Sequence, residues 1–198
     1  QLADLWSCKP SELIFTSGGT ESVNTALFGA ARTRREPGRR ILTTPIEHHA
    51  VLHSLEYLEK NEGFEVDFLP VDRWGQVQFE DVQARLTPET VLVSIMAANN
   101  EIGVIQPVAT IGRWLREQGV LFHTDAVQWF GKLPVASIQD FEADLVSVCA
   151  HKFHGPRGAG LLYARSPLLP DPILFGGGHE NERRAGTENT GAIVGMTE

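Results

Sequence analysis

Three short runs of mostly apolar residues constrain the fold of this chain more than any other feature. They occupy residues 91–96, 120–125 and 144–149, and each has the length of a single β-strand. The first run is apolar except for Ser94, as strands are when both of their faces are buried in a parallel sheet. Segments in which apolar residues recur at helical spacing separate these runs. The pattern predicts a parallel sheet covered by helices.

Further strands are predicted at residues 13–16, 40–44, 64–69 and 160–164, and helices at residues 23–30, 45–58, 79–86 and 108–118. The run at 64–69 alternates apolar and acidic residues, which is typical of a half-exposed strand. Strand and helix alternate with short loops, and this indicates an α/β layered fold. No internal repeat, low-complexity tract or linker interrupts the pattern, so we expect one domain over residues 1–198.

Polar side chains follow the ends of several predicted strands. In open α/β sheets, ligands bind beyond the carboxyl ends of the strands. The residues in question are Thr20, His48, Asn100, Asp125 and Lys152. Their shared position predicts a ligand site at one edge of the sheet.

Lys152 is the first candidate for chemistry at that edge. It follows the run at 144–149 and precedes a Gly-Pro turn, whereas the other three lysines lie in polar, turn-like or helical contexts. A partly desolvated lysine at a strand end can have its pKa lowered enough to act as an amine nucleophile. On local sequence alone, the alternative is an ordinary solvated lysine.

The turn at residues 17–20, Ser-Gly-Gly-Thr, lies between a predicted strand and a predicted helix. Such a turn aims backbone amides and a helix N-terminus at an anion, although hairpins and plain loops also use glycine pairs. Neither the G-x-G-x-x-G turn of dinucleotide-binding folds nor the G-x-x-x-x-G-K-[ST] phosphate loop is present. An anion turn, an amine nucleophile at Lys152, a carboxylate at Asp125 and an imidazole at His48 that can stack on a flat ring indicate a site for pyridoxal 5′-phosphate.

The histidines after residues 40–44 allow other interpretations. His48 could cap the following helix or make a buried hydrogen bond. His49 and His53 are four residues apart and could share a metal ion. No carboxylate or third ligand has a recognised spacing, so no metal site is predicted.

The charge balance argues against nucleic acid as a partner. The net charge is −8, and phosphate contacts require clustered positive charge. Basic residues between Arg32 and Arg40 are interrupted by Glu-Pro-Gly at 36–38, which suggests a solvated helix end and loop. No apolar run is long enough to cross a bilayer and no signal-peptide pattern opens the chain, so no membrane association is expected. Cys8 and Cys149 lie far apart and form no disulfide framework, which predicts a reducing, cytoplasmic location.

Six motifs follow one another along almost the whole chain, at residues 16–24, 47–51, 99–107, 123–128, 150–156 and 176–189. In content and order they resemble the cysteine desulfurases of the NifS/IscS-like branch of the class V aminotransferase superfamily. The closing R-R-A-G-T-E-N resembles this branch rather than the SufS-like one. The resemblance implies the large domain of fold type I, a three-layer fold with a mostly parallel sheet and helices on both faces, and pyridoxal 5′-phosphate as cofactor.

The resemblance implies roles around the cofactor ring. Lys152 would form a Schiff base with the cofactor, and His48 would stack on the pyridine ring and assist proton transfer. Asp125 would pair with the ring nitrogen, and Gln128 would hydrogen-bond the phenolic oxygen. Lys152 and His48 are therefore the predicted catalytic residues.

It also implies roles around the cofactor phosphate. Thr20, with the region of Gly19, and His151 would hold the phosphate. Asn100 would lie beside the ring oxygen and the substrate carboxylate. Thr187 would reach the phosphate of a partner subunit, because sites of this family lie at a dimer interface.

The chain departs from the family pattern in two respects. Cys149 stands where many relatives have a phosphate-binding serine, so a poorer donor replaces a better one. The chain also ends before the family's mobile loop with its catalytic cysteine and before the C-terminal small domain, and it lacks an N-terminal segment. Neither Cys8 nor Cys149 matches the missing cysteine. We therefore expect a cofactor-binding large domain, residues 1–198, truncated at both ends.

The parent enzyme is expected to convert L-cysteine into L-alanine and an enzyme-bound persulfide. It would act as a homodimer and donate sulfur to an iron–sulfur scaffold or other acceptor protein for cluster assembly. The present chain would keep much of the cofactor site but not the sulfur-transfer step. The alternatives are another class V enzyme, such as a selenocysteine lyase or an aminotransferase, and an inactive folded fragment without cofactor.

Overall fold

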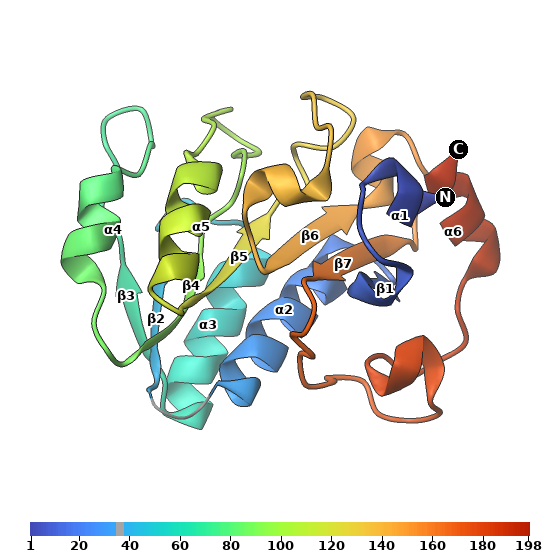
Figure 1. Ribbon diagram of the computed structural model, residues 1–198, viewed down its shortest axis with the longest axis horizontal. Helices are drawn as coiled ribbons and strands as arrows, with labels where there is room; N and C mark the ends of the chain where they lie inside the picture. Colours follow the sequence, from blue (N-terminus) through green and yellow to red (C-terminus); the bar gives the residue numbers. More distant parts are fainter. Residues whose placement is uncertain (35–37) are drawn as a thin grey trace.

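A computed structural model describes residues 1–34 and 38–198, which form a seven-stranded sheet with helices on both faces (Figure 1). The order across the sheet is β1-β7-β6-β5-β4-β2-β3. The strands are β1 (Leu13–Thr16), β2 (Arg40–Thr43), β3 (Glu65–Phe68), β4 (Thr90–Ser94), β5 (Leu121–Asp125), β6 (Leu145–Cys149) and β7 (Gly160–Ala164). From β3 to β6 every pairing is parallel, whereas β7 is antiparallel to β6 and to β1. The predicted mostly parallel α/β fold is confirmed.

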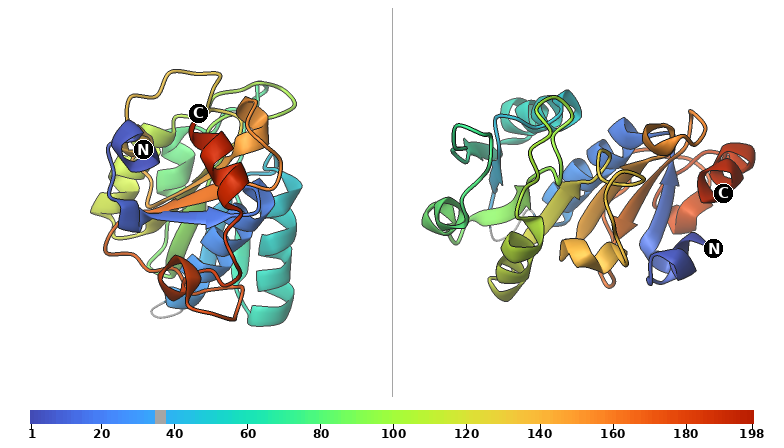
Figure 2. Two further views of the ribbon diagram at one scale, coloured as in Figure 1. Left: turned by 90° about the vertical axis from the view of Figure 1, so that its right-hand side faces the viewer. Right: turned by 90° about the horizontal axis from the view of Figure 1, so that it is seen from above.

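Two layers of helices cover the two faces of the sheet, and α6 lies beyond its β1 edge (Figures 1 and 2). Helices α2 and α3 cover one face, and α1, α4 and α5 cover the other. The α-helices are α1 (Leu2–Leu5), α2 (Gly19–Thr33), α3 (His49–Glu62), α4 (Phe79–Arg85), α5 (Val108–Glu117) and α6 (Thr190–Thr197). The short 3₁₀ helices are η1 (Pro10–Glu12), η2 (Ile138–Phe141), η3 (Ala150–Phe153) and η4 (His179–Glu182).

Strand β4 shows why the central strands have no polar alternation. Leu92 packs in the core under α2 and α3, and its neighbour Val93 packs in the core under α5. Both side chains are fully buried. Successive side chains of a strand point to opposite faces, so a strand between two helical layers must be apolar at nearly every position.

The edge strand β3 is half-exposed, as its alternating pattern predicts. None of its four residues is fully buried, and Phe68 at its end is 46% exposed. Asp67 forms ion pairs with Arg40 on the neighbouring strand and with Arg85 on α4. Charged side chains of this kind protect an exposed sheet edge from pairing with other chains.

The topology brings the predicted site residues to one edge of the sheet. Strands β2, β4, β5 and β6 are parallel, so their carboxyl ends lie together. Strand β1 points the same way, because both it and β6 are antiparallel to β7. The helix that follows β1 therefore starts at the same edge.

The basic segment after α2 is only partly described, because residues 35–37 lie outside the described part of the chain. Within that part, Arg34 is exposed just beyond the end of α2, as predicted. Arg32 is half-buried and forms an ion pair of 2.7 Å with Glu62 at the end of α3. Across residues 1–34 and 38–198, none of the helices combines the length and apolar character needed to span a membrane.

Candidate active site

A cavity of about 210 Å³ lies beyond the carboxyl ends of the parallel strands. Nine of the ten predicted site residues line it: Gly19, Thr20, His48, Asn100, Asp125, Gln128, Cys149, His151 and Lys152. The tenth, Thr187, is an exposed residue of the C-terminal segment and does not line this cavity. The fold thus brings together predicted residues from five separate segments of the chain.

The glycine turn forms one wall of the cavity. Helix α2 starts at Gly19, and its N-cap residue Gly18 supplies no side-chain hydrogen bond to the first turn. A Cβ atom at Gly19 would lie 3.0 Å from Val127 and 3.2 Å from the Cβ of Cys149, so glycine lets the helix start close to the end of β6. The first-turn amides of this fifteen-residue helix therefore lie at the cavity without a side-chain cap, which favours an anion there.

Asp125 places a carboxyl group at the end of β5. It is 6% exposed, and its Oδ1 accepts a hydrogen bond of 2.9 Å from the N–H of Val127. Burial raises the pKa of Asp125, while that hydrogen bond and the charges of His48 and Lys152 oppose the rise. Within the described residues no protein donor bonds to Oδ2, so this oxygen is free to accept a proton-bearing group of a ligand.

His48 both caps α3 and lines the cavity. Its Nδ1 accepts a hydrogen bond of 3.1 Å from the N–H of Ala50. An imidazole that accepts through Nδ1 carries its proton on Nε2 when neutral. His48 therefore caps the helix, as the local sequence suggests, and also forms part of the cavity wall.

The neighbouring histidines lie together on α3 without a third potential metal ligand in the described part of the chain. The rings of His49 and His53 lie 5.1 Å apart on α3. No group of three or more potential ligands occurs among residues 1–34 and 38–198.

The end of β6 supplies three further groups. Cys149 is buried, and its Sγ lies 3.0 Å from Nδ1 of His151. Lys152 follows on the 3₁₀ turn η3 and is exposed. The turn carries this side chain past the end of the strand and into the wall of the cavity.

Gln128 and Asn100 complete the rim. The Oε1 of Gln128 accepts a hydrogen bond from Lys132, which leaves the amide N–H groups of Gln128 available to an anionic oxygen. Asn100 follows Asn99, whose side chain donates to the carbonyl of Ile46 and so ties the loop after β4 to the loop after β2.

Glu47 directly precedes His48 and is buried, and the sequence alone indicates no role for it. Its Oε1 accepts hydrogen bonds from Thr44 (2.7 Å) and from the N–H of Met96 (2.9 Å), and its Oε2 has no partner within the described residues. Burial, with the nearby charge of Asp125, raises the pKa of Glu47 to about 8. Glu47 was part of a recognised motif, but nothing local indicated its burial.

His123, two residues before Asp125, was likewise missed. It is fully buried, with Nδ1 2.8 Å from the hydroxyl of Ser94 and Nε2 2.9 Å from the hydroxyl of Ser147. Burial lowers the pKa of His123 to about 3, so the ring is neutral. The three side chains form a polar ladder across β4, β5 and β6.

The cavity lies at the strand ends of an α/β sheet, where enzymes of this fold class bind their ligands. A glycine turn, a buried carboxylate and a lysine surround it. The chain belongs to the family described as aminotransferase class-V, which matches residues 1–198. The resemblance inferred from the six motifs is confirmed.

Curated relatives carry the comparison further. A putative cysteine desulfurase IscS 1 from Bacillus subtilis is 48% identical over 198 residues, covering 100% of this chain and 52% of the relative. A cysteine desulfurase IscS from Methanosarcina thermophila is 48% identical over 98% of this chain and 48% of the relative. The chain thus spans about half the length of these relatives.

Solved structures agree with this assignment. A structure described as a NifS-like protein has a TM-score of 0.93 and 45% identity, covering 98% of this chain and 53% of that one. A structure described as SspA in complex with cysteine has a TM-score of 0.91 and 39% identity, covering 98% and 56%.

Proposed function

We propose that this chain is the cofactor-binding part of a pyridoxal 5′-phosphate-dependent cysteine desulfurase. The whole enzyme would convert L-cysteine into L-alanine and an enzyme-bound persulfide. The observation that carries the proposal is the convergence of nine predicted residues on one cavity. The names of the curated relatives and the cysteine-bound neighbour support the choice of substrate.

The residues present fit this cofactor. The uncapped start of α2, where a Cβ at Gly19 would crowd Cys149 and Val127, offers backbone amides to a phosphate. The free Oδ2 of Asp125 suits a protonated ring nitrogen, and the amide of Gln128 suits a phenolic oxygen. Lys152 places an amine in the same cavity.

When bound, pyridoxal phosphate supplies an electron sink for negative charge that develops at the substrate Cα. Asp125 would hold the proton on the ring nitrogen through its free Oδ2. Burial raises the pKa of Asp125, and a positively charged ring nitrogen beside it would favour the ionised carboxylate. Because Nδ1 of His48 accepts a hydrogen bond from Ala50, His48 would exchange protons through Nε2. Lys152 would take up and return the proton at the substrate Cα.

Neither cysteine of the chain is placed to accept sulfur. Cys8 does not line the cavity, and burial, together with the charge of Glu12, raises the pKa of its thiol to about 11. Cys149 is buried against His151 beside the glycine turn, at the anion end of the cavity. A cysteine from the remainder of the enzyme would carry the persulfide. We further propose that the whole enzyme is a cytoplasmic homodimer. It would pass its sulfur to an acceptor such as an iron–sulfur scaffold protein.

The deciding experiment adds pyridoxal phosphate to the chain and follows visible absorbance, then fixes the adduct with borohydride and maps it by mass spectrometry. We expect a new absorbance band and an adduct at Lys152, both lost in Lys152→Ala. Lys60→Ala is the matched control, because Lys60 pairs with Glu56 on α3 and does not line the cavity. Survival of the band in Lys152→Ala would overturn the assignment.

A further inference from the structure

The C-terminal strap, residues 174–189, passes the edge strand β1 and leads into α6 (Figure 1). Glu180 accepts a hydrogen bond of 3.1 Å from the N–H of Phe15 on the edge strand β1. Arg183 donates to the carbonyls of Ser11 (2.6 Å) and Leu13 (3.2 Å). These contacts anchor the strap to β1 and to η1 before it, away from the cavity.

One further contact joins the strap to the glycine turn. Arg184 meets Glu21 with two bonds, Nε to Oε1 at 2.7 Å and Nη2 to Oε2 at 3.1 Å. The two residues are 163 positions apart, and their side chains are only 16% and 12% exposed. A two-pronged bond between guanidinium and carboxylate in such a place is geometrically specific and weakly screened.

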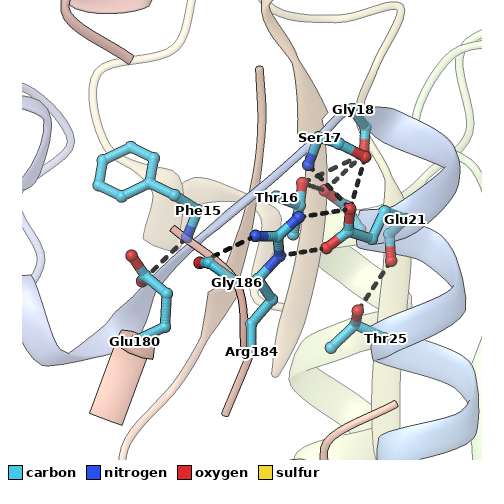
Figure 3. A network of polar contacts seen from close by, with 10 residues as sticks. Phe15, Thr16, Ser17, Gly18, Glu21, Thr25, Glu180, Arg184 and Gly186 are labelled. Carbon is cyan, nitrogen blue, oxygen red and sulfur yellow. Dashed lines mark hydrogen bonds and ion pairs between the residues drawn. The ribbon is translucent and has the colours of Figure 1, made fainter. Parts of the chain in front are cut away.

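The same carboxylate holds the turn itself. Oε2 of Glu21 accepts bonds from the backbone N–H of Ser17 (3.0 Å) and from its hydroxyl (2.5 Å), as Figure 3 shows. Burial raises the pKa of Glu21, but the bonds from Arg184 and Ser17 lower it overall, so the carboxylate is ionised. Glu21 thus connects the strap to the segment that precedes Gly18 and Gly19.

The negative charge of Glu21 affects anion binding at the glycine turn. Glu21 lies in the first turn of α2, the turn whose amides would face the cofactor phosphate. A carboxylate beside an anion site repels the anion unless a cation neutralises it. Within the described chain, Arg184 is the cation that pairs with Glu21.

We propose that Arg184 is a positioning residue for the phosphate subsite: by neutralising and orienting Glu21, the strap sets how tightly the glycine turn holds the phosphate of the cofactor. The inference rests on the proposed function, because it concerns the phosphate of that cofactor. Neither residue lines the cavity, so the pair acts through the turn rather than by touching the ligand.

The test compares the affinities of the full chain for pyridoxal phosphate and for pyridoxal, which lacks the phosphate. Arg184→Met leaves Glu21 unneutralised, and we expect at least about tenfold weaker binding of pyridoxal phosphate, with the affinity for pyridoxal unchanged. Adding Glu21→Gln removes the stranded charge and keeps an acceptor for Ser17. The double variant should therefore recover most of the lost affinity for pyridoxal phosphate. If Arg184 acted only through packing, the double variant would bind as weakly as Arg184→Met.

Glu180→Gln is the matched control, because it weakens the strap's anchor on β1 without touching the turn. It should leave the ratio of the two affinities unchanged. An equal loss in Glu180→Gln, or no recovery in the double variant, would overturn the inference. If Arg184→Met does not fold by circular dichroism, Arg184→Lys serves instead, since it keeps the charge but loses the two-pronged geometry, and a selective, smaller loss is expected.

The outcome is separable from that of the proposed function. If the wild-type chain shows no Lys152-dependent band, the proposed function fails. The phosphate subsite is then probed with inorganic phosphate by ³¹P NMR titration of the same variants. Weaker phosphate binding in Arg184→Met with recovery in the double variant would still support the inference, and equal binding by all variants would refute it.

Discussion

The carboxyl group of Glu47 accepts a hydrogen bond from the backbone N–H of Met96, 2.9 Å away, and so fastens the turn before His48 to the end of β4. Thr44 donates to the same oxygen, and the second oxygen of Glu47 is buried without a partner in the described chain. An ionised carboxylate would leave that buried oxygen charged and unsatisfied, which explains why the group keeps its proton to about pH 8.

The first prediction concerns this proton. In the unfolded chain Glu47 ionises near pH 4.5, whereas in the folded chain it ionises near pH 8. The folded state therefore binds more protons across this window, and the free energy of unfolding falls as the pH rises. Between pH 5 and pH 8 we expect the wild type to lose about 3 kcal/mol relative to Glu47→Gln, which cannot ionise. Urea unfolding of both proteins across this range measures the difference, and a constant difference would contradict the prediction.

A second pH dependence, of opposite sign, follows from His123. Its folded pKa is about 3 against an ordinary 6.5, so the unfolded chain binds the extra proton as the pH falls. Stability should fall between pH 6.5 and pH 3. From pH 7 to pH 4.5 we expect the wild type to lose about 2–3 kcal/mol relative to His123→Asn, which does not titrate. Denaturant titrations of the pair test this, and the idea is wrong if both proteins show the same acid sensitivity.

The third prediction concerns the thiol beside the glycine turn. A serine hydroxyl is a stronger donor than a thiol, and Cys149 lies within bonding distance of His151. We expect Cys149→Ser to bind pyridoxal phosphate more tightly by about 1 kcal/mol. Cys149→Ala, which has no donor, should bind more weakly than the wild type. Equilibrium titration measures all three, and a serine variant no tighter than wild type would argue against a polar role at this position.

The fourth prediction joins the fold to the site through Gly160 on β7. A Cβ atom there would lie 2.5–2.7 Å from the backbone of Gly18. Gly160→Ala must therefore displace the glycine turn, and we expect a cost of about 1–3 kcal/mol in stability, together with weaker binding of pyridoxal phosphate. Gly191→Ala is the control, because its Cβ would meet nothing within 4 Å. Thermal unfolding and titration with pyridoxal phosphate measure the stability and affinity of both variants. Equal losses in Gly160→Ala and Gly191→Ala would exclude the steric explanation.

Much of the fold could be predicted because the relevant patterns are local. The apolar run at residues 91–96, interrupted only by Ser94, predicts burial on both faces, and the structure places Leu92 and Val93 in opposite cores. The strand-end positions of Asp125 and Lys152 also followed from local boundaries. The exposure of Lys152 did not, since desolvation depends on which distant segments cover a group.

The sequence by itself determined the α/β class, the positions of the strands and the residues that follow their carboxyl ends, because hydrophobic periodicity is a property of neighbours along the chain. The tertiary structure alone decided that Glu47 and His123 are buried with shifted pKa values, and that Arg184 meets Glu21 across 163 residues. Desolvation and ion pairing sum over groups that only the folded chain brings together.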